Sequence, residues 1–83
     1  PTANVNAANV ALKRGLLDQA AGYLAKAGDT PQAVHARGVL ALLRGRLDEA
    51  QPLLERARRE GIDEAAANLD ILRKMRGMQS SDF

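Results

Sequence analysis

The chain has 83 residues, no cysteine, one tyrosine and one phenylalanine, and a formal net charge of +2 at pH 7. The lack of cysteine excludes a disulfide framework and a thiolate metal site, and the nearly balanced charge argues against a nucleic-acid-binding protein. A chain of this length supports one small domain, and its Ala- and Leu-rich composition predicts an all-α fold.

Five helical segments are predicted in chain order. The first runs from about residue 3 to residue 13 and ends at Gly15, a residue type that closes helices in the left-handed conformation. The second ends at Gly28 and carries an apolar stripe at helical spacing, formed by Leu17, Ala20, Ala21, Leu24 and Ala27.

The third segment has the clearest start signal. Thr30 can cap the helix by accepting hydrogen bonds from free backbone amides, and Pro31 suits the first helical position. We expect this helix to continue to Arg44 and to stop at Gly45.

The fourth segment repeats the apolar stripe of the second, starts at Leu47 and ends at Gly61. Pro52 lies inside it and removes one helical hydrogen bond. Asp63 is predicted to cap a fifth helix that ends at residue 75 or 76, and residues 77–83 are predicted to form a flexible tail.

The chain repeats itself with an offset of 30 residues. Residues 11–20 and 41–50 are identical at seven of ten positions. Self-similarity at such a period is typical of stacked supersecondary units that cannot bury their apolar faces alone. Short links join the first helix to the second and the third to the fourth, so we expect two antiparallel hairpins, in units of about 1–28 and 31–61. A closing helix over 63–76 completes one predicted domain of residues 1–76.

Small and apolar residues recur at matched positions of the two units. They are Ala8, Gly15, Ala20, Leu24 and Ala27 in the first unit and Gly38, Gly45, Ala50, Leu54 and Ala57 in the second. This pattern resembles that of tetratricopeptide repeats, with two repeats and a capping helix. The resemblance implies a right-handed stack of two antiparallel helical hairpins. In this arrangement Ala8 would face Ala20, and Gly38 would face Ala50. The sequence departs from the family pattern at Arg37, where leucine is usual, and in its shortened repeat.

The resemblance also implies a concave groove lined by the first helices, which would bind a peptide or a neighbouring domain. The predicted groove residues are Asn6, Asn9, Lys13, His35, Val39, Leu42, Asn68 and Ile71. Amide side chains can pair with a peptide backbone as donors and as acceptors. The alternative is that the apolar members pack against neighbouring helices while Asn6 and Asn9 face water. The carboxylate clamp of chaperone-binding family members is not expected, because Val5 and Ala36 occupy two of its positions.

Neither catalysis nor metal binding is predicted. His35 is the single histidine and has no acidic residue one helical turn away, and the aligned Asp18 and Asp48 suit helix starts. We therefore expect no enzyme, no cofactor and no metal site. The basic residues of the last third alternate with acidic ones and lack an aromatic neighbour for base stacking, so nucleic acid is not an expected partner. No apolar run reaches the roughly 20 residues that span a bilayer.

The sequence thus predicts a non-catalytic protein–protein interaction module whose partner it does not identify. The alternative is a structural spacer or a self-association segment, acting through exposed end faces, within a larger protein such as one of a bacterial envelope. The chain begins at Pro1 without a methionine, and we interpret it as an excised piece of a longer protein or as a processed one. The cytoplasm and the periplasm or envelope both remain open as compartments.

Overall fold

A computed structural model of the chain describes residues 2–80. Five helices and no strand occur in this range, which confirms the predicted all-α class. The helices are α1 (Thr2–Lys13), α2 (Leu17–Leu24), α3 (Pro31–Leu43), α4 (Leu47–Arg59) and α5 (Glu64–Ser80).

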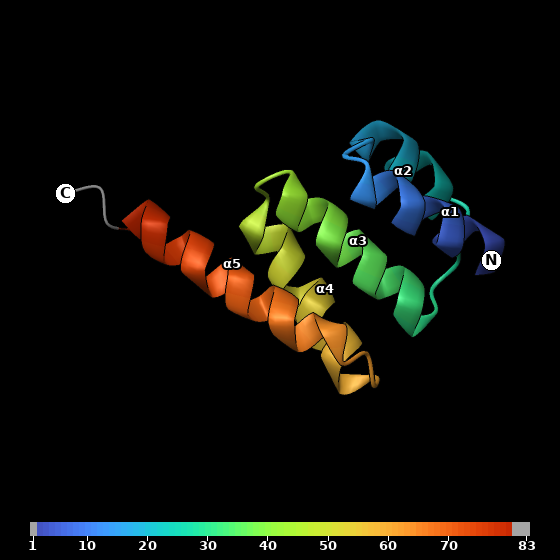
Figure 1. Ribbon diagram of the computed structural model, residues 1–83. Coiled ribbons are helices and arrows are strands. Elements are labelled where there is room, and N and C mark those ends of the chain that lie inside the picture. The colour runs from blue at the N-terminus through green and yellow to red at the C-terminus, as the bar shows by residue number, and fades with distance from the viewer. Residues whose placement is uncertain (1, 81–83) are drawn as a thin grey trace.

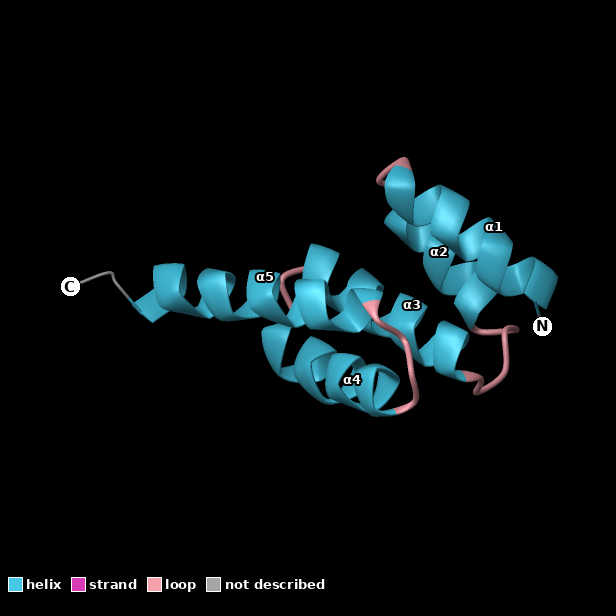
Figure 2. Ribbon diagram, turned by 60° about the horizontal axis from the view of Figure 1, so that its bottom comes forward, coloured by secondary structure: helices cyan, strands magenta, loops and turns pink. Residues whose placement is uncertain are grey.

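The helices pack as two consecutive hairpins and one further helix (Figure 1). The first hairpin is α1 with α2, the second is α3 with α4, and α5 packs against α4. Since α3 also contacts α1 and α5, these three helices form one layer. Both α2 and α4 lie on the same side of this layer, where they flank α3. No contact joins α2 to α4 in the described part of the chain. The C-terminal end of α5 projects beyond α4 (Figure 2).

The predicted helix signals are present in the structure. The Thr30 side chain accepts a hydrogen bond from the Ala33 amide at 3.2 Å, and Pro31 opens α3. Gly15 and Gly45 follow α1 and α3 with φ of 73° each, the left-handed conformation that favours glycine. The equivalent positions of the two hairpins therefore share the same local geometry, as their sequence identity indicates.

Small residues allow the two helices of each hairpin to approach closely. Ala8 and Ala20 are fully buried in one core cluster of the first hairpin. In the second hairpin, a β-carbon added at Gly38 would lie 2.8 Å from Leu54 Cδ2 and 3.3 Å from Leu53 Cβ. The atoms nearest to this position belong to these leucines, and the predicted pairing of Gly38 with Ala50 stays a prediction. The position of Gly38 directly over α4 leaves no room for a side chain.

Two helix ends differ from the prediction. Helix α2 ends at Leu24 instead of reaching Gly28, because the amides of Lys26 and Ala27 bond three residues back and tighten the chain into turns. Helix α5 continues to Ser80, so the predicted end at residue 75 or 76 is wrong.

Helix α5 contacts α4 at Arg76, close to the end predicted from the sequence. Arg76 donates to Asp48 Oδ1 and Gln51 Oε1 of α4, at 3.0 Å each. Gly77 inside a helix costs only about 1 kcal/mol relative to alanine, so the helix can continue past it. Residues 81–83 of the predicted tail lie outside the described residues.

Candidate functional site

The predicted groove residues of α1 lie at the protein surface. Asn6, Asn9 and Lys13 are all exposed, and Ile71 on α5 is 47% exposed. These side chains are accessible to a partner, although they lie on helices that α3 separates.

Two predicted groove residues, His35 on α3 and Asn68 on α5, form a pair. The Asn68 side-chain nitrogen lies 2.9 Å from His35 Nε2, and both residues are half-buried. An amide nitrogen only donates, so His35 Nε2 accepts and the ring is neutral with its proton on Nδ1. Burial lowers the pKa of His35 below its usual value, and the nearby Glu64 opposes this shift. The pair joins α5 to α3 and occupies polar atoms that the predicted groove would offer to a peptide.

The two apolar groove residues of α3 lie mainly in the core. Leu42 is 5% exposed and belongs to the core cluster between the second hairpin and α5. Val39 is half-buried and packs against this cluster and against that of the first hairpin. Leu42 therefore offers almost no surface to a partner, and we remove it from the candidate site.

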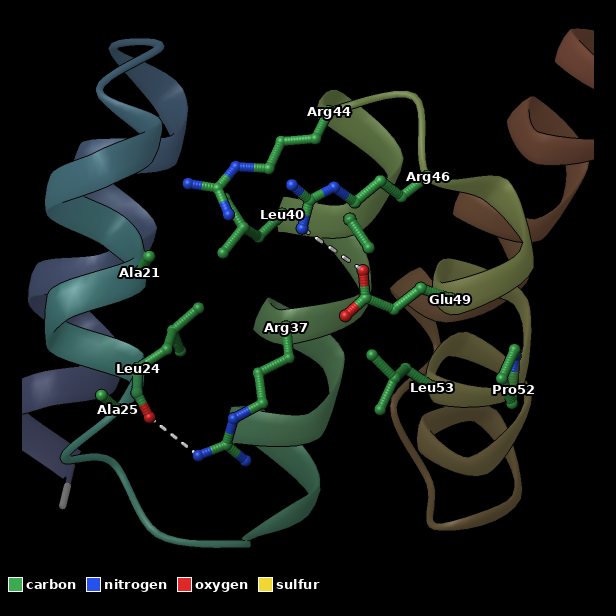
Figure 3. A pocket seen from close by; sticks show the side chains of 11 residues that line it. Ala21, Leu24, Ala25, Arg37, Leu40, Arg44, Arg46, Glu49, Pro52 and Leu53 are labelled. Atoms are coloured by element: carbon green, nitrogen blue, oxygen red, sulfur yellow. Dashed lines mark hydrogen bonds and ion pairs between the residues drawn. The ribbon is translucent and has the colours of Figure 1, made fainter.

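A cavity lies on the side of α3 that faces away from the predicted groove. This central cleft has a volume of about 590 Å³ and lies between α2 and α4, with α3 as its floor (Figure 3). The floor residues recur at spacings of three and four and so share one helix face; they are Arg37, Leu40, Ala41 and Arg44. His35, Val39 and Leu42 project from the opposite face of α3, because they are offset from the floor residues by about half a helical turn.

The walls of the central cleft are mainly apolar. Helix α2 contributes Ala21 and Leu24, and Ala25 follows at its end; α4 contributes Glu49, Pro52 and Leu53, and Arg46 precedes it. Leu24 and Leu53 approach from opposite walls, with Leu40 between them on the floor (Figure 3). Leu24 and Leu40 are buried beneath the cleft, and its accessible apolar surface comes from Leu53 together with Ala25 and Pro52.

Arginines form the rim of the central cleft. Three guanidinium groups, those of Arg37, Arg44 and Arg46, line it together with a single carboxylate, Glu49. Arg46 lies 3.9 Å from Glu49, and Arg44 pairs at 3.1 Å with Asp18 of α2. The lining thus holds three guanidinium groups and one carboxylate, and the carboxylates of Asp18 and Asp29 lie beside Arg44 and Arg37 just outside it.

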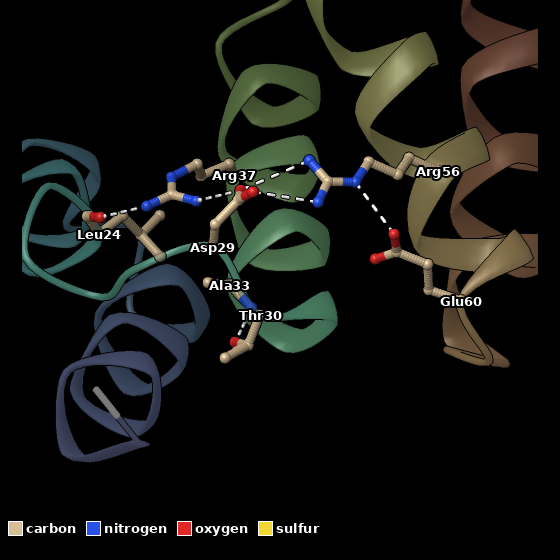
Figure 4. Close-up of polar contacts among 7 residues, drawn as sticks. All are labelled: Leu24, Asp29, Thr30, Ala33, Arg37, Arg56 and Glu60. Atoms are coloured by element: carbon tan, nitrogen blue, oxygen red, sulfur yellow. Dashed lines mark hydrogen bonds and ion pairs between the residues drawn. The ribbon is translucent and has the colours of Figure 1, made fainter.

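Polar contacts around Asp29, in the link between the hairpins, join this link to α3 and α4 beside the cleft (Figure 4). Arg56 of α4 donates to both carboxylate oxygens of Asp29, at 3.4 and 3.1 Å, and Arg37 lies 3.8 Å from the same carboxylate. The hydrogen bond and charge of Arg56 hold the pKa of Asp29 below its usual value. Arg37 also donates to the Leu24 carbonyl oxygen at 2.8 Å. Through these contacts α3 and α4 hold the end of α2 in place.

These contacts were not predicted from the sequence. The available signal was Arg37 itself, an arginine at a position where the pattern of the repeat has leucine. A charged residue at such a position needs a polar partner, and the Leu24 carbonyl at the end of α2, which also accepts from the Ala27 amide, has a second lone pair for it.

A metal site requires grouped ligand side chains, and a membrane-spanning helix requires length and apolar character. Residues 2–80 contain no group of three or more His, Asp or Glu side chains that could hold a metal ion. None of the helices described is long and apolar enough to cross a membrane. Comparisons of the chain with protein-family models, with curated proteins and with solved structures find no match.

Proposed function

We propose that this chain is a non-catalytic protein-interaction module that binds a peptide segment of a partner protein in the central cleft. The observation that carries this proposal is the combination of an apolar lining with an arginine rim in a cleft of about 590 Å³. A volume of this size accommodates a few side chains of a docked segment. The resemblance to tetratricopeptide repeats supports the same class of function.

The lining defines the chemistry of the expected segment. Apolar side chains of the segment would contact the accessible apolar lining, which consists of Ala21, Ala25, Pro52 and Leu53, above the buried Leu24 and Leu40. Acidic side chains flanking them would lie near Arg44 and Arg46, because complementary charges steer binding and exclude other partners. The best ligand is therefore a short segment with two or three large apolar residues and carboxylates beside them.

The face of the first helices is a second candidate surface for the same function. Its exposed amides, Asn6 and Asn9, can hydrogen-bond to a peptide backbone. The pairing of His35 with Asn68 and the burial of Leu42 reduce what this face offers. We therefore place the central cleft first.

Selection from a random peptide library displayed on phage tests the proposal. The immobilised chain should enrich peptides that combine apolar and acidic residues, and Ala25→Glu should abolish the enrichment. This substitution puts a carboxylate at an exposed position in the cleft wall, where it competes with those of the ligand. Ala3→Glu is the matched control, since Ala3 is exposed on α1 and does not line the cleft.

The variants distinguish binding in the central cleft from binding on the face of the first helices. The site would lie on the first-helix face if two results are obtained together. The enriched peptides would bind Ala25→Glu as well as the unchanged chain, and they would not bind the double variant Asn6→Arg, Asn9→Arg. A library from which the chain enriches no peptide would overturn the proposed function.

A further inference from the structure

A second cleft, smaller than the central one, lies on the outer side of the first hairpin. It has a volume of about 250 Å³, and we call its surface the end face. It is lined by Ala7, Val10, Ala11 and Arg14 of α1 with its link, and by Leu16, Gln19 and Tyr23 at α2. Each of these residues stands 30 positions before a residue that lines the central cleft. The end face is therefore the counterpart, one repeat earlier, of the surface that α3 and α4 present to α2.

The two equivalent surfaces differ in what covers them. Leu40 is 9% exposed because it packs in the cluster that includes Leu24 of α2, whereas its counterpart Val10 is 51% exposed. Leu16 and Tyr23 are each 40% exposed on the same face. The end face thus has the apolar character of a helix-binding surface, and in the described part of the chain no helix lies over it.

Helix α2 shows which chemistry fits such a surface. Its first turn carries Asp18, which pairs with Arg44 at 3.1 Å, and Ala21 and Ala25 follow at three and seven positions on the side that faces α3. The counterpart of Arg44 on the end face is Arg14. A matching helix therefore needs a carboxylate in its first turn, and small or apolar residues three and seven positions later.

The outer face of α5 has this order of residues at the three positions, and Asp70 stands where α2 has Leu24. Glu64 lies in the first turn of α5, and Ala67 and Ile71 follow at three and seven positions. These residues project away from the buried side of α5, which carries Leu69 and Leu72. Ile71 is 47% exposed, so this α5 face presents apolar surface to solvent.

Two more residues extend the α5 face toward the C-terminal end of the helix. Met78 lies two turns after Ile71 and is 65% exposed. Lys74 lies between them, and its aliphatic stem can cover apolar surface while its ammonium group stays in water. The α5 face thus consists of Glu64, Ala67, Ile71, Lys74 and Met78, with two large exposed apolar side chains at Ile71 and Met78.

We propose that the α5 face of one copy of this chain docks on the end face of a second copy, so that the protein associates head to tail. Glu64 of one copy would pair with Arg14 of the other, as Asp18 pairs with Arg44 within the chain. The first hairpin and α5 lie at opposite ends of the stack (Figure 1). Because the two surfaces differ, the contact is heterologous, and it adds copies in a row instead of closing a two-fold dimer.

Sedimentation equilibrium over micromolar to millimolar concentrations tests this contact. The average mass of the unchanged chain should rise steadily above that of the monomer. Val10→Glu, on the end face, and Ile71→Glu, on the α5 face, should each remain monomeric. Leu43→Glu is the matched control and should associate like the unchanged chain, because Leu43 is 52% exposed and lines neither surface. Circular dichroism confirms that each variant is folded, and Arg14→Glu replaces Val10→Glu if the latter loses helix.

A mixture of the two monomeric variants decides the geometry. Val10→Glu keeps its α5 face and Ile71→Glu keeps its end face, so an equimolar mixture should form one-to-one dimers and no larger species. The unchanged chain remaining monomeric throughout the concentration range would overturn the proposal. Association that both single variants retain, or a mixture that stays monomeric, would overturn it as well.

Discussion

Arg37 on α3 donates a hydrogen bond to the carbonyl oxygen of Leu24, the last residue of α2, at 2.8 Å. The contact joins two consecutive units of the repeat through a side chain of one and the backbone of the other. Leu24 forms one wall of the central cleft and Arg37 part of its floor, so the same bond fixes the shape of the candidate site.

Replacing Arg37 by methionine tests the energy of this contact. The substitution keeps most of the apolar stem and removes the charged donor. We expect Arg37→Met to lower the free energy of unfolding by about 1–2 kcal/mol, because the Leu24 carbonyl loses its charged donor and keeps only the longer bond from the Ala27 amide. Urea unfolding measures the change. Arg73→Met is the control and should have an effect of less than about 0.5 kcal/mol, since Arg73 pairs with Asp70 on the surface. Equal losses in both variants would contradict the assigned role of Arg37.

Two glycine-to-alanine substitutions should have opposite effects. At Gly38 the new β-carbon would meet Leu54 at 2.8–2.9 Å, and Leu54 is fully buried, so we expect a loss of about 1–3 kcal/mol. At Gly22, in α2, there is open space around the position, and alanine should stabilise the helix by about 0.5–1 kcal/mol. Thermal or urea unfolding distinguishes the two signs. A Gly38→Ala variant as stable as the unchanged chain would show that α3 and α4 lie further apart.

Neighbouring residues of α5 should differ in their contribution to stability. Leu72 is 1% exposed and packs against the second hairpin, whereas Ile71 is 47% exposed. We expect Leu72→Ala to cost about 2–5 kcal/mol, because it removes buried apolar volume and leaves a cavity. Ile71→Ala should cost less than about 1 kcal/mol when measured at a concentration where the chain is monomeric. Equal losses would mean that α5 does not pack on α4 with this face.

The stability of the chain should fall as the pH falls through the ordinary titration range of histidine. Burial lowers the pKa of His35 in the folded state below its usual value, so the unfolded state takes up the proton first. The contribution of neutral His35 to the free energy of unfolding is therefore fully present above the ordinary pKa of about 6.5. It is lost as the pH falls from there toward the lower pKa of the folded state.

Urea unfolding from about pH 7.5 to about pH 5.5 measures this loss. His35→Gln is the control: glutamine can also accept from Asn68 and does not titrate, so its stability should change less across this range. Since the sequence contains one histidine, the difference between the two slopes belongs to His35. If the free energy of unfolding changes equally with pH in the unchanged chain and in His35→Gln, the lowered pKa of His35 is contradicted.

Features set by neighbouring residues could be predicted from the sequence. The cap at Thr30 and the left-handed Gly15 and Gly45 follow from local stereochemistry, and the structure has all three. The two hairpins follow from the short links between their helices, and the internal repeat indicates that the two units are alike.

The faces of α3 could not be assigned in this way. This helix carries apolar residues on all sides, among them Val34, Val39, Leu40 and Leu42, because α1, α2, α4 and α5 all contact it. Helical periodicity identifies the buried side only when the other side is polar. Leu42 was therefore placed in the groove by the resemblance, although it lies in the core.

The central cleft could not be predicted because long-range contacts form it. Its width depends on how far α2 lies from α4. The packing of both helices on α3 positions them, and contacts of Arg37 with Leu24 and of Arg56 with Asp29 join residues 13 and 27 positions apart. Spacing along one helix contains no information on such pairs.

The most direct test of the proposed function is to locate a bound peptide on the chain. A peptide enriched by the immobilised chain would be titrated into isotope-labelled protein, and backbone amide shifts would be followed by NMR. Binding in the central cleft predicts that the largest changes occur at Ala25, Leu40 and Leu53, and that Ala25→Glu removes them. Changes concentrated at Asn6, Asn9 and Asn68, with little effect at the cleft, would contradict it.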